Sequence, residues 1–194
     1  MAAFSLIELM FVVGIAATLS AIAVPHSLAS LDDSRTLGAA RYVSTRLQRT
    51  RLEALTGNAA AALRISRSAN SYSFNVYVDG NRNGVLSRDI QSGVDRAIQS
   101  TERLSDHFPG VDFGVISGLP AVDSSSIPPG ADPIRLGSSD MATFTAMGTA
   151  TAGSLYVLGR RDTQYVVRIF GETGKTRVLK FNPRTWQWNP LSDS

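Results

Sequence analysis

The sequence predicts an α+β fold in which one long, kinked N-terminal helix packs on an antiparallel β-sheet head. Residues 4–24 are mostly apolar and contain one charged residue, a glutamate, and residues 35–56 carry apolar residues at helical spacing. From residue 60 onward the apolar pattern changes to a period of two, which is typical of strands. We therefore expect a first helical segment at 4–24, an amphipathic stalk helix at 25–57 and a β-rich globular head at 58–194.

The first segment is long enough to cross a membrane. As a helix, residues 4–24 would extend about 32 Å at roughly 1.5 Å per residue, close to a hydrocarbon core of about 30 Å. A cleaved signal peptide has a shorter apolar run, and a buried core helix usually shows a polar stripe, so both alternatives fit less well. We therefore expect a transmembrane segment.

Glu8 is the one charged residue in this segment. A carboxylate at bilayer depth costs on the order of 2.5–3.5 kcal/mol, and residues of this kind are usually functional. The segment holds no cation, and the nearest arginine downstream is Arg35. Glu8 therefore needs a cation from another molecule, unless it lies shallow enough to reach the lipid headgroups.

Pro25 follows the apolar segment directly. Proline lacks an N–H and clashes with the carbonyl four residues earlier, so the helix should bend or break there. Asp32, Asp33 and Ser34 are candidate N-cap residues for the stretch that follows, and Gly57 with Asn58 is its expected stop. An apolar stripe along this stretch predicts which face of the helix packs on the head. The stripe consists of Leu37, Ala40, Val43 or Ser44, Leu47 and Ala54, and Leu52 and Leu55 are expected to widen it.

Five runs of residues predict the strands of the head. Runs at 60–66 and 72–79 form a hairpin pattern, and Tyr72, Phe74, Val76 and Val78 of the second run share one face. Three more strands across 154–182 read as an antiparallel meander joined by good turn sequences. Between these groups, residues 117–140 are rich in Gly, Pro and Ser, which predicts a surface loop with a short strand at 133–136.

The stretch FSLIELM at residues 4–10 resembles the N-terminus of type IV pilins and type II secretion pseudopilins, which typically read FTLIEL. The resemblance implies that a prepilin peptidase cleaves between Ala3 and Phe4, leaving residues 1–3 as a residual leader, and that the new amine of Phe4 is methylated. It implies that residues 4–24 also form the filament core, that Glu8 pairs with the terminal amine of an adjacent subunit, and that Pro25 kinks the helix. The family usually has glycine before the cut and a basic leader, whereas this chain has Ala3 and two residues before it.

The head is similar in its order of stretches to the GspH/FimT group of pseudopilins and minor pilins. Asp79–Gly84 matches the DxNxNG turn of that group, and Gly148–Leu158 and Gly171–Arg177 match its glycine-rich strand entry and its GxxxR-like turn. This resemblance implies a structural minor pilin or pseudopilin that assembles through its N-terminal helix into a type IV pilus or a type II secretion pseudopilus.

The same resemblance implies partners and a location. The partners are other pilin or pseudopilin subunits, the prepilin peptidase, the inner-membrane assembly platform and the membrane, with secreted cargo as a further candidate for a subunit near the tip. The location is the bacterial inner membrane, crossed once with the head in the periplasm, or the pilus or pseudopilus filament.

The stretch DGNRNGVLSRDI at 79–90 partly fits a calcium loop. Asp79, Asn81 and Asn83 occupy the first, third and fifth positions, but Ile90 stands where the bidentate glutamate belongs. The alternative is a turn in which Asn and Asp side chains bond their own backbone, and the pattern favours it. We therefore expect no cofactor, with calcium as the weaker hypothesis.

No other pattern predicts a catalytic site. The stretch GETGKT has Ile169 where a phosphate loop needs its first glycine, and it lies between two expected strands. Ser105, Asp106 and His107 are adjacent, whereas hydrolase triads assemble from distant positions. The chain has no cysteine, which excludes a catalytic thiol, thiolate metal ligands and disulfides. The sequence therefore predicts a protein that is not an enzyme.

Basic residues gather near the C-terminus, although the whole chain carries only +3. From Arg160 to Arg184 there are seven basic residues and two acidic ones, and Trp186 and Trp188 follow. Basic residues beside aromatic ones can bind single-stranded nucleic acid, so a DNA-binding minor pilin in DNA uptake is the alternative function. A solvated strand face and an acidic protein partner also fit. The candidate DNA contacts are Arg160, Arg161, Lys175, Arg177, Lys180 and Arg184.

Overall fold

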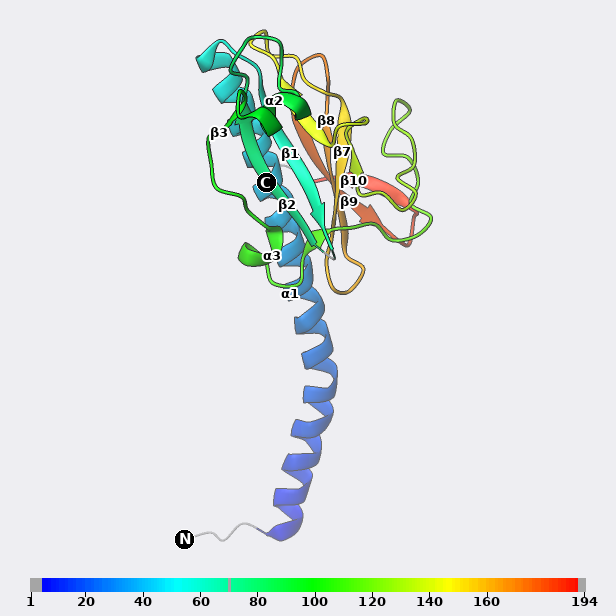
Figure 1. Cartoon of the computed structure of the whole chain (residues 1–194). Helices are drawn as coiled ribbons and strands as arrows, with labels where there is room; N and C mark the ends of the chain where they lie inside the picture. Colours follow the sequence, from blue (N-terminus) through cyan, green and yellow to red (C-terminus); the bar gives the residue numbers. More distant parts are fainter. Residues whose placement is uncertain (1–4, 70, 192–194) are drawn as a thin grey trace.

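One long helix and two antiparallel sheets make up the molecule. The computed structural model describes residues 5–69 and 71–191, and within the helix the side chains of residues 22 and 24–26 lie outside that description. The helix α1 (Leu6–Gly57) lies against the head with its upper half and projects from it with its lower half (Figure 1). The expected α+β class, a long N-terminal helix packed on an antiparallel β head, is confirmed.

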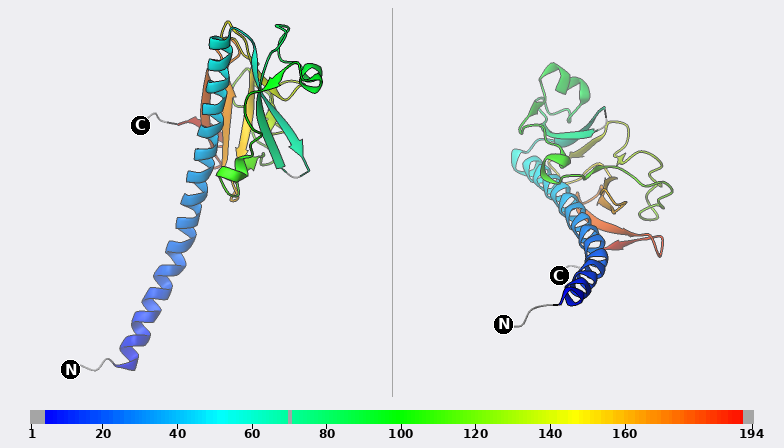
Figure 2. Two further views of the ribbon diagram at one scale, coloured as in Figure 1. Left: turned by 60° about the vertical axis from the view of Figure 1, so that its left-hand side comes forward. Right: turned by 90° about the horizontal axis from the view of Figure 1, so that it is seen from below.

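Helix α1 continues through Pro25 without interruption. The sequence predicted that the helix would either bend or break at Pro25, and the prediction of a break is wrong. Proline removes one backbone hydrogen bond, and the remaining hydrogen bonds of this 52-residue helix hold it together. Figure 2 shows α1 as a gently bowed rod, and a local kink at Pro25 stays a prediction. The N-cap role expected for Asp32, Asp33 and Ser34 is also wrong, since all three lie inside the helix. The stop is confirmed, with Asn58 in the left-handed conformation at φ 46°.

The first sheet has four strands in the order β3-β2-β1-β6. Strands β1 (Ala61–Ser68) and β2 (Ser71–Val78) form the predicted hairpin, in register from Ala61 opposite Val78 to Ser68 opposite Ser71. Phe74 and Val76 are buried and face the core as expected. The outer strands are β3 (Arg96–Ala97), which pairs with β2, and β6 (Met141–Phe144), which pairs with β1.

The second sheet has the order β10-β9-β8-β7-β4, with β5 also paired to β7. Its centre is the predicted meander of β7 (Gly153–Leu158), β8 (Gln164–Ile169) and β9 (Thr176–Asn182). Strand β5 (Ile134–Arg135) confirms the short strand expected in the loop. The sequence did not predict β4 (Asp112–Phe113), β10 (Gln187–Pro190), or the short helices α2 (Ser87–Ser92) and α3 (Leu104–His107).

The main core lies between the upper half of α1 and both sheets. Ala40, Val43, Leu47 and Ala54 of the predicted stripe are buried there. Leu52 and Leu55 do not widen the stripe as expected, because their side chains are 58% and 40% exposed. At 3.6 residues per turn these two positions lie about 140° and 80° around the helix from Leu47, beyond the arc that the head covers.

A second apolar cluster lies on the opposite face of the larger sheet. Residues 115–133, which we call the strap, cross that face, and Leu119 packs there with Tyr156, Val166 and Leu179. Trp188 of β10 holds the strap by donating a hydrogen bond from Nε1 to the Pro120 carbonyl at 3.1 Å. The predicted surface loop is therefore partly a packed covering layer.

Candidate assembly site

The lower half of α1 presents apolar side chains to solvent on every side. The large side chains from Leu6 to Leu19 are exposed, for example Phe11 at 70%, and nothing else in the described chain packs on them (Figures 1 and 2). Within the part of the chain that the structure describes, no helix combines the length and the apolarity of a membrane span. Soluble proteins rarely leave so continuous an apolar surface uncovered unless a partner binds it.

Glu8 lies in the first turn of this bare segment. Ser5 is the N-cap residue, but its side chain makes no capping hydrogen bond, and the Glu8 side chain has no hydrogen bond or ion pair among the described residues. Because α1 is one unbroken helix, Arg35 is held about 40 Å away at roughly 1.5 Å per residue. No arginine of this helix can therefore neutralise Glu8. The predicted processing residues Ala3 and Phe4 lie outside the described residues.

Asp32 joins the helix to the head. Its carboxylate accepts hydrogen bonds from the backbone N–H groups of Arg160 and Arg161, at 3.0 and 3.1 Å, and from the Thr163 hydroxyl at 2.8 Å. It thus caps the turn between β7 and β8 instead of the helix N-terminus expected from the sequence. Gly159 allows this close approach, because a Cβ at that position would come within 2.7 Å of Asp32 Oδ2.

Asp33 makes a second link between the helix and the same sheet. It accepts a hydrogen bond from the Tyr165 hydroxyl at 2.9 Å and forms an ion pair with Lys180 at 2.6 Å. Burial raises the pKa of the Tyr165 phenol, and the hydrogen bond to Asp33 raises it further. This hydroxyl therefore stays a donor throughout the neutral range. The bare helix is therefore fixed to the head by directional bonds as well as by apolar packing.

A third link was missed by the sequence analysis. Glu102 accepts hydrogen bonds from the Tyr42 hydroxyl and from Arg46, both on α1. Its partners are 56 and 60 residues away in the chain, so no local pattern could reveal the cluster. It ties the segment before α3 to the helix on the side of the smaller sheet.

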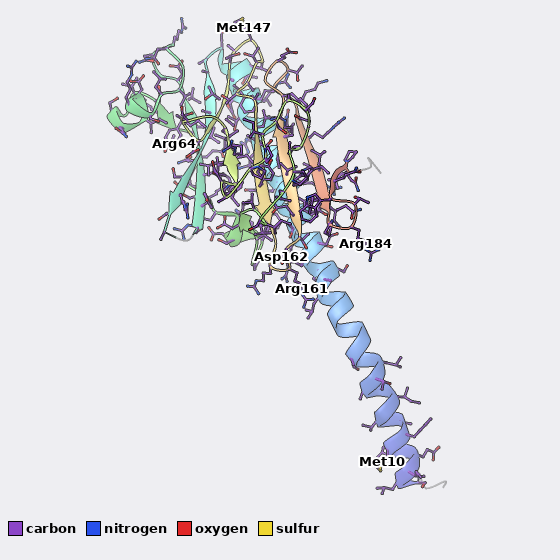
Figure 3. All side chains as sticks on the ribbon, turned by 90° about the vertical axis from the view of Figure 1, so that its right-hand side faces the viewer. Met10, Arg64, Met147, Arg161, Asp162 and Arg184 are labelled. Atoms are coloured by element: carbon purple, nitrogen blue, oxygen red, sulfur yellow. The ribbon has the colours of Figure 1, made fainter. Side chains whose placement is uncertain are left out.

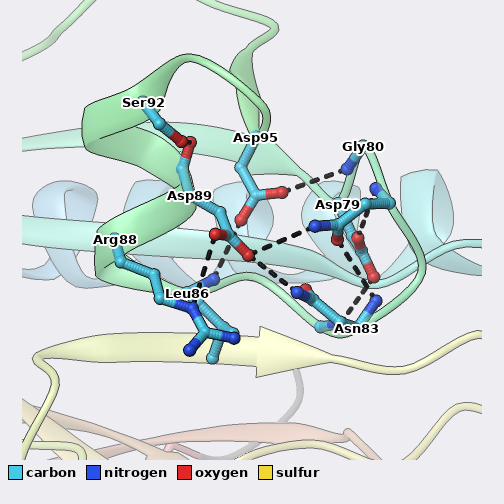
Figure 4. A network of polar contacts seen from close by, with 10 residues as sticks. Asp79, Gly80, Asn83, Leu86, Arg88, Asp89, Ser92 and Asp95 are labelled. Atoms are coloured by element: carbon cyan, nitrogen blue, oxygen red, sulfur yellow. Dashed lines mark hydrogen bonds and ion pairs between the residues drawn. The ribbon is translucent and has the colours of Figure 1, made fainter.

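The candidate calcium residues lie in the turn after β2 (Figure 4). Asp79 accepts hydrogen bonds from the backbone N–H groups of Asn81, Arg82 and Gly84, at 2.7 to 3.0 Å. Asn81 and Asn83 direct their side-chain amides to Asp89. This is the backbone-bonded turn that the sequence favoured. Among the described residues no group of three or more acidic or histidine side chains is arranged to hold a metal ion.

The structure distributes the six candidate DNA contacts over two ends of the sheet. Arg160 and Arg161 lie in the β7–β8 turn, and Figure 3 shows Arg161 where α1 leaves the head, with Arg184 farther along that edge. Lys175 and Arg177 lie at the opposite end, next to the β8–β9 turn. The remaining residue, Lys180, is paired with Asp33. The six candidate residues therefore do not lie together in one basic surface.

The two tryptophans form an aromatic cluster with the sheet. Trp188 packs on Tyr156 and Phe181, with ring centroids 5.8 and 5.3 Å apart, and Trp186 packs edge-on against Phe181. Trp188 is therefore engaged in holding the strap and the sheet edge together. Only Trp186, at 51% exposure, offers much of its ring to solvent.

The described chain is thus a two-sheet head carried on a helix whose lower half is uncovered. No protein-family model and no curated protein matches its sequence. Two solved structures of the minor pseudopilin EpsH from the type II secretion system of Vibrio cholerae are similar in fold. One is 15% identical with a TM-score of 0.46, covering 75% of this chain and 97% of that one. The other is 14% identical with a TM-score of 0.47, covering 84% and 99%.

Proposed function

We propose that this chain is a structural subunit, a minor pilin or pseudopilin, that joins a pilus or pseudopilus filament through the lower half of α1. The observation that carries the proposal is an apolar helix segment that is bare on all sides and rigidly attached to a separately packed head. A helix that is apolar all round needs an apolar environment, which bundled helices of neighbouring subunits would supply. The resemblance of FSLIELM to pilin N-termini supports the same assignment.

Glu8 supplies the register in this proposal. In a bundle of apolar helices an unpaired carboxylate is costly, and it gains most from one fixed cation. The liberated amine of Phe4 on a neighbouring subunit is the cation that the resemblance implies. Since each subunit carries one such amine and one Glu8, pairing them sets the axial offset between neighbours.

Before assembly the same segment would lie in the inner membrane, with the head in the periplasm. This stage rests on the pilin resemblance and on the single charge among residues 4–24. Prepilin peptidase, the assembly platform and secreted cargo belong to this proposal as partners.

Replacement of Glu8 tests the function. Glu8→Ala should leave the head folded and the protein in the membrane fraction, but it should reduce recovery in sheared filaments by at least about tenfold, because the register-setting pair is lost. The matched control is Glu53→Ala, which removes an acidic residue from the upper half of the same helix, and this variant should assemble normally. Normal recovery of the Glu8→Ala variant in filaments would refute the pairing.

DNA contact by the basic C-terminal residues stays the second proposal. The geometry supports it less than the structural one, because Lys175 and Arg177 are separated from Arg160 and Arg161 by the length of the strands. A gel-shift titration with single-stranded DNA at several salt concentrations tests it. Steep salt dependence is the expected signature, and an absence of binding at low salt would remove the proposal.

A further inference from the structure

Two adjoining cavities open on the outer face of the larger sheet, beside the strap. Their volumes are about 510 and 580 Å³, and they share Ser125, Ala152 and Arg168 as lining residues. Each volume is within the range of about 300–1,000 Å³ that is typical of ligand sites. Together they form one elongated groove centred on Arg168, on the side of the sheet opposite α1.

The strand register explains why the groove lies there. Tyr156, Val166 and Leu179 are direct cross-strand partners, and the strap covers this row. The next row on the same face is Ser154, Arg168 and Arg177, and it lies along the margin of the strap. In Figure 3 the strap crosses in front of the strands of the larger sheet.

Arg168 is buried and already has a partner. Its Nε donates to Asp123 at 2.8 Å, and its Nη2 donates to Asp123 and Ser125 at 3.3 and 2.9 Å. Burial alone would raise the pKa of Asp123, but hydrogen bonds from Ser125 and Arg168 outweigh it and hold the pKa below its ordinary value. The pair therefore stays ionised at neutral pH and fixes the strap as one wall of the groove.

Arg177 and Lys175 are different from Arg168, because they are exposed and unpaired. Arg177 lies directly opposite Arg168, a like-charge neighbour that is tolerable because Asp123 neutralises Arg168. In the described part of the chain the side chains of Arg177 and Lys175 make no hydrogen bond or ion pair. Both line the larger cavity, where Glu172 is the one acidic lining residue. The groove thus offers two free cations to an anionic ligand.

Apolar side chains lie beside these cations. Phe170, 39% exposed, lines the larger cavity, and Ile127 of the strap, 70% exposed, lines the smaller one. Ser125 and Thr173 add hydroxyl groups to the lining. A ligand that fits this lining carries carboxylates next to apolar groups and is narrow enough to enter cavities of this size.

We propose that this groove binds an extended acidic segment of a partner protein, with its carboxylates at Lys175 and Arg177 and an apolar side chain against Phe170. An extended chain is narrow enough to follow the two cavities, whereas a folded surface cannot enter them. A single-stranded nucleic acid fits less well. It needs a continuous track of cations with several exposed aromatic rings. This groove has two free cations and one exposed ring, and its lining includes Glu172 and Asp132, the latter paired with Arg135.

A fluorescence-anisotropy titration of the full-length protein in detergent tests the proposal. The probe is a short fluorescein-labelled peptide that alternates glutamate with leucine or alanine. The double variant Lys175→Ala/Arg177→Ala should weaken binding by about tenfold, and the charge-conserving Lys175→Arg/Arg177→Lys should retain it. The matched control is Arg82→Ala/Arg96→Ala, which removes the same charge from two exposed residues near the smaller sheet and should change affinity less than twofold.

Three outcomes would overturn the proposal. One is no anisotropy change at low salt, and another is an equal loss of affinity in the groove and control double variants. The third is tighter binding of an oligothymidine probe than of the peptide, with the same loss in Lys175→Ala/Arg177→Ala, which would assign the groove to nucleic acid. Unchanged thermal unfolding of each variant confirms that the head is intact. The assay uses unassembled protein, so its result is independent of whether Glu8 directs filament assembly.

Discussion

The two halves of α1 belong to one helix and have opposite environments. In the upper half, apolar residues occupy one face, and Ala39, Ala40, Val43 and Leu47 are buried against the sheets. In the lower half, large apolar residues follow one another around the whole circumference, and those whose side chains the structure describes are exposed. The upper half gains its stability from the chain's own head. The lower half holds apolar surface that only another molecule can cover, and this is why function is assigned to it.

Substitutions in the two halves should differ most in their effect on the free energy of unfolding of the head. Leu47→Ala removes a fully buried side chain and should destabilise the head by about 2–5 kcal/mol, as measured by urea unfolding in detergent with tryptophan fluorescence. The matched change Leu9→Ala in the bare half should alter head stability by less than about 0.5 kcal/mol, since that side chain touches nothing in the head. A large effect of Leu9→Ala would show that the lower half does contribute to the head's own fold.

A smaller effect is expected at the junction between the halves. Asp32→Ala removes a buried carboxylate that accepts three hydrogen bonds, and should cost about 1.5–3 kcal/mol in the same measurement. Lys180→Ala, which removes the half-exposed ion pair with Asp33, is the control and should cost at most about 1 kcal/mol. Equal losses in the two variants would mean that Asp32 is not the principal link between helix and head.

Local patterns predicted the elements that local interactions determine. The helix stop at Asn58, the β1–β2 hairpin and the β7–β8–β9 meander each follow from turn chemistry and from side-chain period, and the structure has all three. Strand β5 also lies inside its predicted range. These features require only neighbours in sequence, so a single sequence contains the information for them.

Asp32 shows why the remaining features were not predictable. An aspartate before an amphipathic stretch is a good N-cap candidate, but its true partners, Arg160 and Thr163, lie about 130 residues away in the chain. Leu52 and Leu55 were assigned to the core because the sequence does not show how far the head wraps around the helix. The groove at Arg168 depends both on the position of the strap and on the register of the strands. Neither can be read from the sequence alone.

For the candidate site, the sequence identified the residue of interest, and the structure showed that no arginine of the same helix lies near it. Glu8 was singled out as one charge among apolar residues. The unbroken helix then shows that Arg35 cannot reach it, which supports the proposal that a second molecule supplies its cation.

The most direct test is zero-length carbodiimide crosslinking of purified filaments, with the products identified by mass spectrometry. A carbodiimide joins a carboxylate to an amine only when the two are in contact. We predict an intermolecular amide between Glu8 of one subunit and the terminal amine of Phe4 of its neighbour, absent from detergent-solubilised monomers. Filaments in which Glu8 forms no such bond, although the amine of Phe4 is free to react, would contradict the account.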